Sequence, residues 1–127
     1  MKNAYQLPEK QTVLIVEDEP QVLNMAEMIL KENGYEVLKA TTPNKAIDLA
    51  RQNQGRIQLL LTDVIMPEMD GEELSKQING FEADINTLFM TGYSDDEIAE
   101  KTNIKGNLIR KPFTVQELIE KIQEILR

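Results

Sequence analysis

The fold is decided by the stretch IQLLLTDVIMPEMDG, which covers residues 57–71. Its first half is a nearly continuous apolar run that leads directly to Asp63. Such a run is too short for a typical helix, and apolar residues on both sides of the chain indicate a strand that is covered on both faces. In the second half a proline and a glycine mark a loop, and Asp70 and Glu73 form a capping-box-like pair that opens a helix.

Short apolar runs alternate with amphipathic segments on both sides of this stretch. Strands are predicted at residues 12–16, 35–40, 57–62, 85–90 and 108–110. Helices are predicted from residue 20 to the Asn-Gly pair at 33–34, from Thr42 to near Gly55, after Asp70, after Ser94 and from Thr114 to the C-terminus. This order predicts a parallel sheet between two layers of helices, joined by right-handed crossovers. The expected fold class is α/β, as a three-layer α/β/α sandwich around a five-stranded parallel sheet.

One domain is expected over residues 1–127, because no linker or low-complexity tract interrupts the pattern. Residues 1–11 are interpreted as a polar leader, and the folded core is expected to cover about 12–126. A chain of this length buries roughly two thirds of its unfolded surface, so it needs no disulfide or structural metal to fold. The absence of cysteine agrees with this expectation.

Composition excludes several classes of function. The 127 residues carry a net charge of -8, which disfavours binding to nucleic acid or to an anionic membrane. No apolar run approaches 18 residues and the first residues lack the apolar stretch of a secretory signal, so a cytoplasmic location is expected. The absence of histidine excludes imidazole metal sites, serine-histidine nucleophile pairs and a phosphohistidine on these residues.

Polar side chains follow the predicted strands where each strand ends. Glu17 and Asp18 follow the first strand, Asp63 the third, Thr91 the fourth and Lys111 the fifth. In open α/β sheets the ligand crevice lies beyond the carboxyl ends of the strands, so these side chains are expected to converge. The pattern therefore predicts a site built from carboxylates, a hydroxyl and a lysine.

Three converging carboxylates require a cation. Two unit charges about 4 Å apart repel by on the order of 4 kcal/mol at an effective dielectric constant near 20. Oxygen ligands without histidine or cysteine suit a hard ion, Mg²⁺ above all. A carboxylate beside such an ion can attack phosphorus. The metal and Lys111 would neutralise the phosphoryl oxygens, and the Thr91 hydroxyl would donate a hydrogen bond to one of them.

These residues resemble the response-regulator receiver domains of two-component signalling. The resemblance rests on VLIVEDE at 13–19, LTDVIMPEMDG at 61–71, MTGY at 90–93 and KPF at 111–113, and it covers residues 12–126. It implies the flavodoxin-like receiver fold. The strand order would be 2-1-3-4-5, which is the order already known for receivers among doubly wound sheets.

The resemblance also implies a role for each site residue. Asp63 is expected to accept the phosphoryl group, Thr91 to sense it and Lys111 to pair with it. Mg²⁺ is expected to bind Asp18, the neighbouring Glu17, Asp63 and the backbone carbonyl of Ile65. A cis bond between Lys111 and Pro112 is implied as well, an isomer that is common only before proline.

The implied partners are a sensor histidine kinase or a histidine phosphotransfer protein, which donates from phosphohistidine, and an unidentified effector that reads the altered surface. No nucleic acid and no membrane is expected to bind, and a monomer or weak dimer is expected. The domain is not expected to be an enzyme beyond catalysing its own phosphorylation and dephosphorylation. The MTGYS sequence at 90–94 resembles receivers attached to hybrid histidine kinases.

Two residues depart from the usual receiver pattern. Leu108 occupies the position three before the lysine, where the family often has a tyrosine or phenylalanine that swings inward. The response is therefore expected to pass mainly through Thr91 and the loop that follows it. Glu17 stands where many receivers have aspartate, which shifts the carboxylate by about one bond length without abolishing metal binding.

Other interpretations of the same residues stay open. A pseudo-receiver that binds partners without phosphorylation is the main alternative, with Leu108 in its favour. A phosphatase is disfavoured because Ile65 replaces the second acid two residues after Asp63. Met66 and Met69 are expected to pack against the core, Tyr93 to shield the acyl phosphate, and the acidic run at 95–97 to offset a helix dipole.

Overall fold

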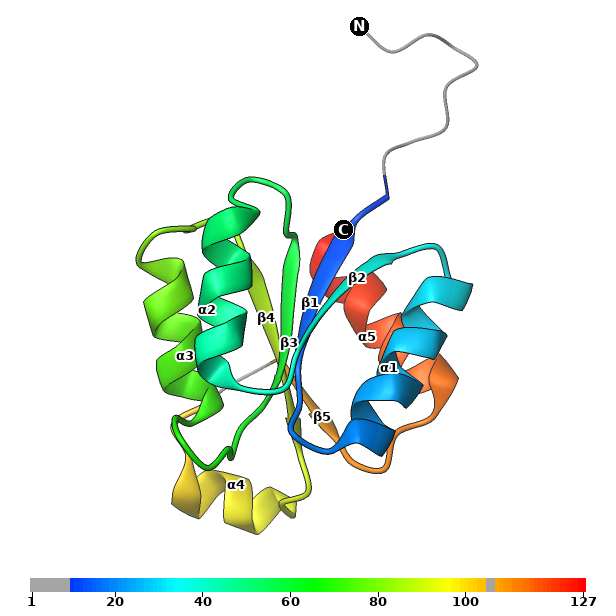
Figure 1. Ribbon diagram of the computed structural model, residues 1–127. Helices are drawn as coiled ribbons and strands as arrows, with labels where there is room; N and C mark the ends of the chain where they lie inside the picture. The colour runs from blue at the N-terminus through cyan, green and yellow to red at the C-terminus, as the bar shows by residue number, and fades with distance from the viewer. Residues whose placement is uncertain (1–9, 105–106) are drawn as a thin grey trace, which may run out of the picture.

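The computed structural model describes residues 10–104 and 107–127, and most of the predicted leader, residues 1–9, lies outside this part of the chain. Strands and helices alternate without exception through the described residues (Figure 1). The strands are β1 (Thr12–Val16), β2 (Glu36–Ala40), β3 (Leu59–Asp63), β4 (Asn86–Thr91) and β5 (Leu108–Arg110). The helices are α1 (Pro20–Glu32), α2 (Pro43–Gln52), α3 (Gly71–Asn79), α4 (Asp95–Lys101) and α5 (Val115–Leu126).

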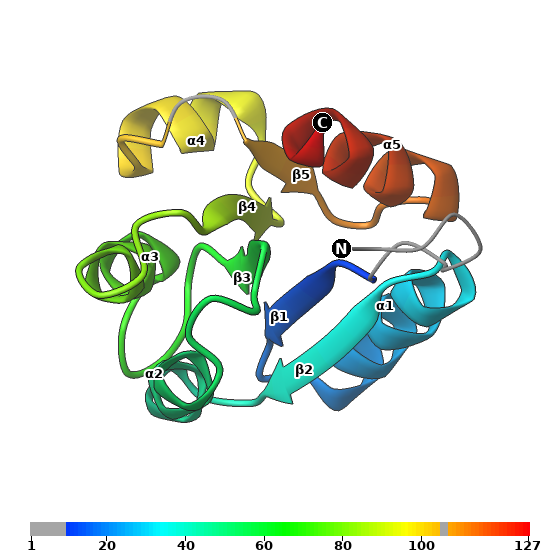
Figure 2. The ribbon, with the colours of Figure 1, turned by 90° about the horizontal axis from the view of Figure 1, so that it is seen from above.

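The five strands form one parallel sheet in the order β2-β1-β3-β4-β5, which confirms the order that the resemblance implied. Viewed from above, α1 and α5 cover one face of the sheet, and α2 and α3 cover the other (Figure 2). Every residue of β1 and of β3 is buried, because both strands lie inside the sheet and carry helices on both faces. The predicted three-layer α/β/α architecture is confirmed.

Two apolar clusters hold the layers together, one on each face of the sheet. Successive residues of a strand point to opposite faces, so β3 sends Leu61 into the cluster under α1 and α5, and Leu60 into the cluster under α2 and α3. The first cluster also contains Ile29 of α1 and Ile122 of α5.

Most of the helix starts follow the predicted capping signals. Thr42, Asp70, Ser94 and Thr114 each accept a hydrogen bond from the amide three residues later, and the last two complete full capping boxes. Helix α4 differs from the rest because none of its seven residues is buried. Among the described residues, no helix combines the length and apolar character needed to cross a membrane.

The bounds of β1 and β5 are as predicted, and those of β2, β3 and β4 differ from the predicted ones by one or two residues. The third strand begins at Leu59 instead of residue 57 and runs on to include Asp63, which pairs with Met90 of β4. The fourth strand likewise includes Thr91, which pairs with Arg110. Because ladder pairing and not apolar character sets where a strand ends, polar side chains at the ends of the apolar runs belong to the strands.

Candidate functional site

The polar residues predicted to converge do meet at the carboxyl edge of the sheet. Glu17 and Asp18 directly follow β1, Asp63 and Thr91 end β3 and β4, and Lys111 directly follows β5. Parallel strands bring all these chain positions to the same edge. They line a cleft of about 590 Å³ together with Glu19, Ile65, Met66, Pro67, Met90, Gly92 and Tyr93.

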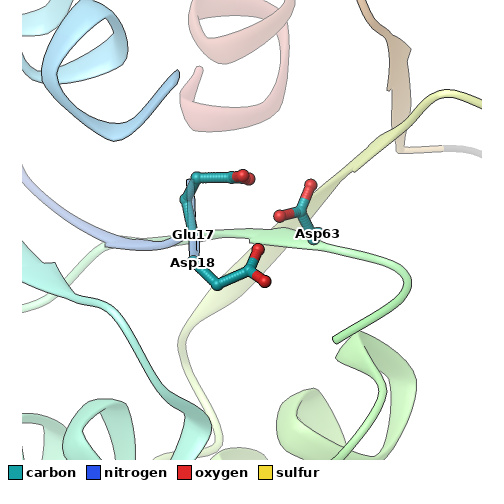
Figure 3. A group of neighbouring side chains, drawn as sticks. All are labelled: Glu17, Asp18 and Asp63. Atoms are coloured by element: carbon teal, nitrogen blue, oxygen red, sulfur yellow. The ribbon is translucent and has the colours of Figure 1, made fainter. Parts of the chain in front are cut away.

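Three carboxyl groups gather in this cleft. Glu17 and Asp18 reach toward Asp63 from the end of the neighbouring strand (Figure 3). One carboxylate oxygen from each residue lies within 4.8 Å of the other two. Glu17 and Asp63 are buried, whereas Asp18 is exposed. A donor set made only of oxygen atoms, with one side open to solvent, suits a hard divalent cation that retains part of its water shell.

Lys111 joins two of these carboxylates. Its Nζ lies 2.5 Å from Oδ1 of Asp63 and 3.0 Å from Oε2 of Glu17. The other oxygen of Glu17, Oε1, accepts a hydrogen bond of 3.2 Å from the backbone N–H of Glu19. Glu17 is completely buried, so these two contacts fix its carboxylate inside the site.

The protonation of the site reflects its excess of negative charge. Burial and the neighbouring Glu17 raise the pKa of Asp63 to about 8, against the smaller opposing effect of Lys111. Burial alone lowers the pKa of Lys111, but hydrogen bonds and charges from Asp63 and Glu17 outweigh it, so the pKa is raised. The pKa of Asp63 is raised chiefly because the group is buried, and the pKa of Lys111 because two acids lie beside it, in a cleft with more acidic than basic side chains. A divalent cation would relieve the same imbalance.

Thr91 lines the cleft and is almost fully buried. Its Oγ1 accepts a hydrogen bond of 3.0 Å from the backbone N–H of Tyr93. The half-buried Tyr93 ring lies at the rim, with Nζ of Lys101 in α4 5.0 Å from its centroid. The hydroxyl is therefore tied directly to the segment that leads into α4.

The remaining singled-out residues have distinct positions. Ile65 lines the cleft and is exposed. Leu108 lies outside the cleft, half-buried at the start of β5. Met66 and Met69 pack on the cluster under α2 and α3, as predicted, and Met66 also lines the cleft. The structure contains the cis peptide bond before Pro112 that the resemblance implied.

Thr62 was not singled out from the sequence, although it shapes the site. Its hydroxyl donates a hydrogen bond of 3.1 Å to the carbonyl oxygen of Asp63, and its side chain is completely buried. The available signal was a polar residue at the end of an otherwise apolar run. That signal does not distinguish a hydroxyl that contacts substrate from one that holds the backbone.

Comparison with known proteins identifies relatives of the whole arrangement. A family model described as "Response regulator receiver domain" matches residues 13–123. The chain is 31% identical to Sensor kinase CckA of Brucella abortus in an alignment of 128 residues that covers 99% of this chain and 14% of CckA. It is 28% identical over 116 residues to the response regulator receiver protein CpdR of the same organism, which covers 90% of this chain and 95% of CpdR.

A solved structure agrees with these sequence relatives. The crystal structure of the receiver domain from the hybrid histidine kinase CckA superposes with a TM-score of 0.77 at 34% identity. The match covers 91% of this chain and 99% of that domain. Some relatives are therefore matched along nearly their whole length, and in others the same unit is a small part of a longer protein.

Proposed function

The chain belongs to the response regulator receiver domain family of two-component signalling, and on that premise we propose that Asp63 accepts a phosphoryl group from a partner's phosphohistidine. One observation carries the assignment of the residue. Among the cleft's carboxylates, only Asp63 is both in contact with Lys111 and placed on β3, between the residues that follow β1 and those that end β4. Asp63 therefore lies between the two acids that follow β1 and the threonine that ends β4.

The transfer exchanges one bond to phosphorus for another. Asp63 reacts as the ionised carboxylate, with its proton released to solvent. One of its oxygens attacks the phosphorus atom, the P–N bond of the donor breaks, and the imidazole nitrogen keeps the electron pair. The product is an acyl phosphate on Asp63. The ammonium of Lys111 stabilises the charge on the phosphoryl oxygens, and the Thr91 hydroxyl donates to one of them. For that donation Thr91 turns toward the phosphoryl group and its contact with the Tyr93 amide changes.

The carboxylates of Glu17, Asp18 and Asp63, with the backbone carbonyl of Ile65, would hold Mg²⁺. When bound, this ion supplies positive charge that offsets the carboxylates and the incoming phosphoryl oxygens. Lys111 and the Glu19 amide fix the position of the Glu17 carboxylate. Asp18 is exposed, so the site is open to solvent on its side.

The donor is proposed to be a sensor histidine kinase or a histidine phosphotransfer protein. No histidine occurs among the 127 residues, so the phosphohistidine must lie outside them. The likeness to CckA and CpdR supports both settings for such a unit, within a kinase and in a short regulator. The only reactions proposed for these residues are the self-catalysed transfer and the hydrolysis of the resulting acyl phosphate to Asp63 and inorganic phosphate.

The pseudo-receiver alternative has no specific support. The feature in its favour was Leu108, which stands where receivers often have an inward-swinging aromatic residue. Leu108 lies outside the cleft, so the acceptor site is intact without that aromatic. Glu17, Asp18, Asp63 and Lys111 are all present and close together.

The decisive test is the intact mass of the protein after incubation with phosphoramidate, a small donor whose P–N bond resembles that of phosphohistidine. We expect one phosphoryl adduct on the wild type that depends on Mg²⁺, and none on Asp63→Asn. Asp48→Asn is the matched control, because it makes the same chemical change on an exposed position of α2.

The control should gain the adduct at the wild-type rate. An adduct of equal yield on Asp63→Asn would reject the assignment of the acceptor. A wild type that binds Mg²⁺ and gains no adduct would reject the proposed transfer in favour of a phosphorylation-independent module.

A further inference from the structure

Gly71 is the first residue of α3, and its backbone lies against the end of β3 that carries Asp63. A Cβ atom added at Gly71 would overlap the carbonyl oxygen of Asp63. It would also lie 3.1 Å from the carbonyl carbon of Asp63 and 3.3 Å from Cγ2 of Thr62. All three atoms belong to the last two residues of the strand that presents the acceptor carboxylate.

Backbone conformation does not explain a glycine at this position. The glycines with left-handed φ angles are Gly34 and Gly55, at +90° and +81°, and both have open space where a Cβ would be. Gly71 has no such φ angle. Gly71 is the first helical residue after the Asp70 N-cap, a position that has no particular preference for glycine. The close approach to Asp63 is therefore what demands the missing side chain.

Neither partner in this contact is free to move away. The N–H of Gly71 donates a hydrogen bond of 2.7 Å to the carbonyl oxygen of Val64, whose own N–H donates to Met90 of β4 at 2.9 Å. On the helix side, the Asp70 side chain caps α3 and Leu74 is fully buried one turn further. The start of α3 is thus fastened to the chain immediately after Asp63.

An added Cβ would force these two segments apart by about 1 Å to restore ordinary van der Waals separation. The end of β3 would then shift, and with it the Asp63 carboxylate that faces Lys111 and the two other acids. Misplacement of a reacting group by about 1 Å is enough to slow a reaction by up to ~100-fold.

We propose that Gly71 is a positioning residue for the phosphoryl acceptor: the absence of its side chain sets where Asp63 stands in the cleft. The inference rests on the proposed function for its effect on phosphorylation. Its effect on the position of Asp63 is independent of that function, so the two are tested separately.

The test compares wild type, Gly71→Ala and Ile78→Ala. Ile78 is fully buried in the same helix but outside the cleft, so its truncation destabilises α3 without touching Asp63. Phosphorylation by phosphoramidate is followed with varied donor concentration, well below each melting temperature. In parallel, Mg²⁺ is titrated while backbone amide signals are recorded by NMR.

For Gly71→Ala we expect a maximal phosphorylation rate about 10-fold to 100-fold below that of the wild type, with little change in the half-saturating donor concentration. Mg²⁺ affinity should fall. When the spectra of Gly71→Ala and the wild type are compared without Mg²⁺, the largest differences in amide signals, apart from those next to residue 71 itself, should occur at residues 62–64. Ile78→Ala should lose thermal stability and keep the wild-type rate and Mg²⁺ affinity.

Three results would overturn the inference: a wild-type rate and Mg²⁺ affinity in Gly71→Ala, an equal loss of rate in Ile78→Ala, or a Gly71→Ala chain that fails to fold while Ile78→Ala folds. The last would make the glycine a requirement of the fold as a whole. A wild type that is not phosphorylated would instead reject the proposed function. The Mg²⁺ and NMR measurements would still decide whether Gly71 places Asp63.

Discussion

The faces and the carboxyl edge of the sheet are made by the same strands, and they bury opposite kinds of side chain. Along β3, Leu60 and Leu61 are completely buried among apolar neighbours on the two faces. Two residues further, Asp63 is buried beside Glu17, and a single lysine contacts both acids. The chain thus changes from apolar to charged burial within one strand.

This difference separates stability from function. On the faces, each buried leucine contributes by removing apolar surface from water. At the edge, burial of like charges raises the pKa of Asp63 and opposes folding at the pH where the carboxylate is ionised. The packed faces hold the edge in place, and the unfavourable gathering of acids at the edge is an arrangement that a bound cation would relieve.

The largest expected effect lies on the faces. Leu60→Ala should lower the free energy of unfolding by about 2–5 kcal/mol, because it leaves a cavity in the cluster under α2 and α3. The phosphorylation rate per folded molecule should stay that of the wild type. Urea titration measures the first quantity and intact mass over time the second. A stable variant with a slowed reaction would show that the faces and the edge are not separable.

At the edge, Asp63→Asn should stabilise the protein in the presence of a chelator at alkaline pH. The pKa of Asp63 is raised to about 8 in the folded state, so the folded protein binds a proton that the unfolded chain releases above about pH 4. Wild-type stability therefore falls as the pH rises from about 4 to 8 and then levels off. The variant lacks this loss and should be more stable by up to about 5 kcal/mol above pH 8, since each unit of pKa difference corresponds to about 1.4 kcal/mol.

Urea titrations of both proteins at several pH values check this prediction. The difference should be close to zero near pH 4 and should narrow at high pH when Mg²⁺ is added, because the ion binds the folded wild type. A difference that is independent of pH would trace the effect to something other than ionisation of Asp63.

The smallest expected effect compares two helices with the same capping signal. Thr114→Ala should cost about 1 kcal/mol of global stability, because α5 buries Leu118, Ile119 and Ile122 on the sheet. Ser94→Ala should cost less than about 0.5 kcal/mol, because α4 buries no residue and frays without exposing core. Hydrogen exchange should instead quicken within α4. Equal global losses would show that α4 is coupled to the faces.

Much of the fold was accessible from local patterns. Alternating apolar runs and capping residues located all the described elements, because a buried strand needs apolar side chains and a helix start needs a partner for its free N–H groups. The ends of β3 and β4 were misplaced because Asp63 and Thr91 are polar. Their membership of the strands depends on pairing with neighbours that are distant in sequence.

The candidate site was predicted by position but not in its internal contacts. The carboxyl-edge rule selected Glu17, Asp18, Asp63, Thr91 and Lys111, and all of them line one cleft. The pairing of Lys111 with Glu17 as well as Asp63 had no local signal, because their charges are common on any surface.

By itself the sequence determined the order and approximate position of the strands and helices, which end of each strand carries the polar groups, and that no histidine lies among the 127 residues. These properties depend on near neighbours in the chain and on which residue types are present. Only the tertiary structure decided that Glu17 is fully buried while Asp18 is exposed, that α4 buries none of its residues, and that Gly71 lies against Asp63. These properties depend on how the layers approach one another. That approach is set by close packing of segments that are distant in the sequence, so no local sequence pattern predicts it.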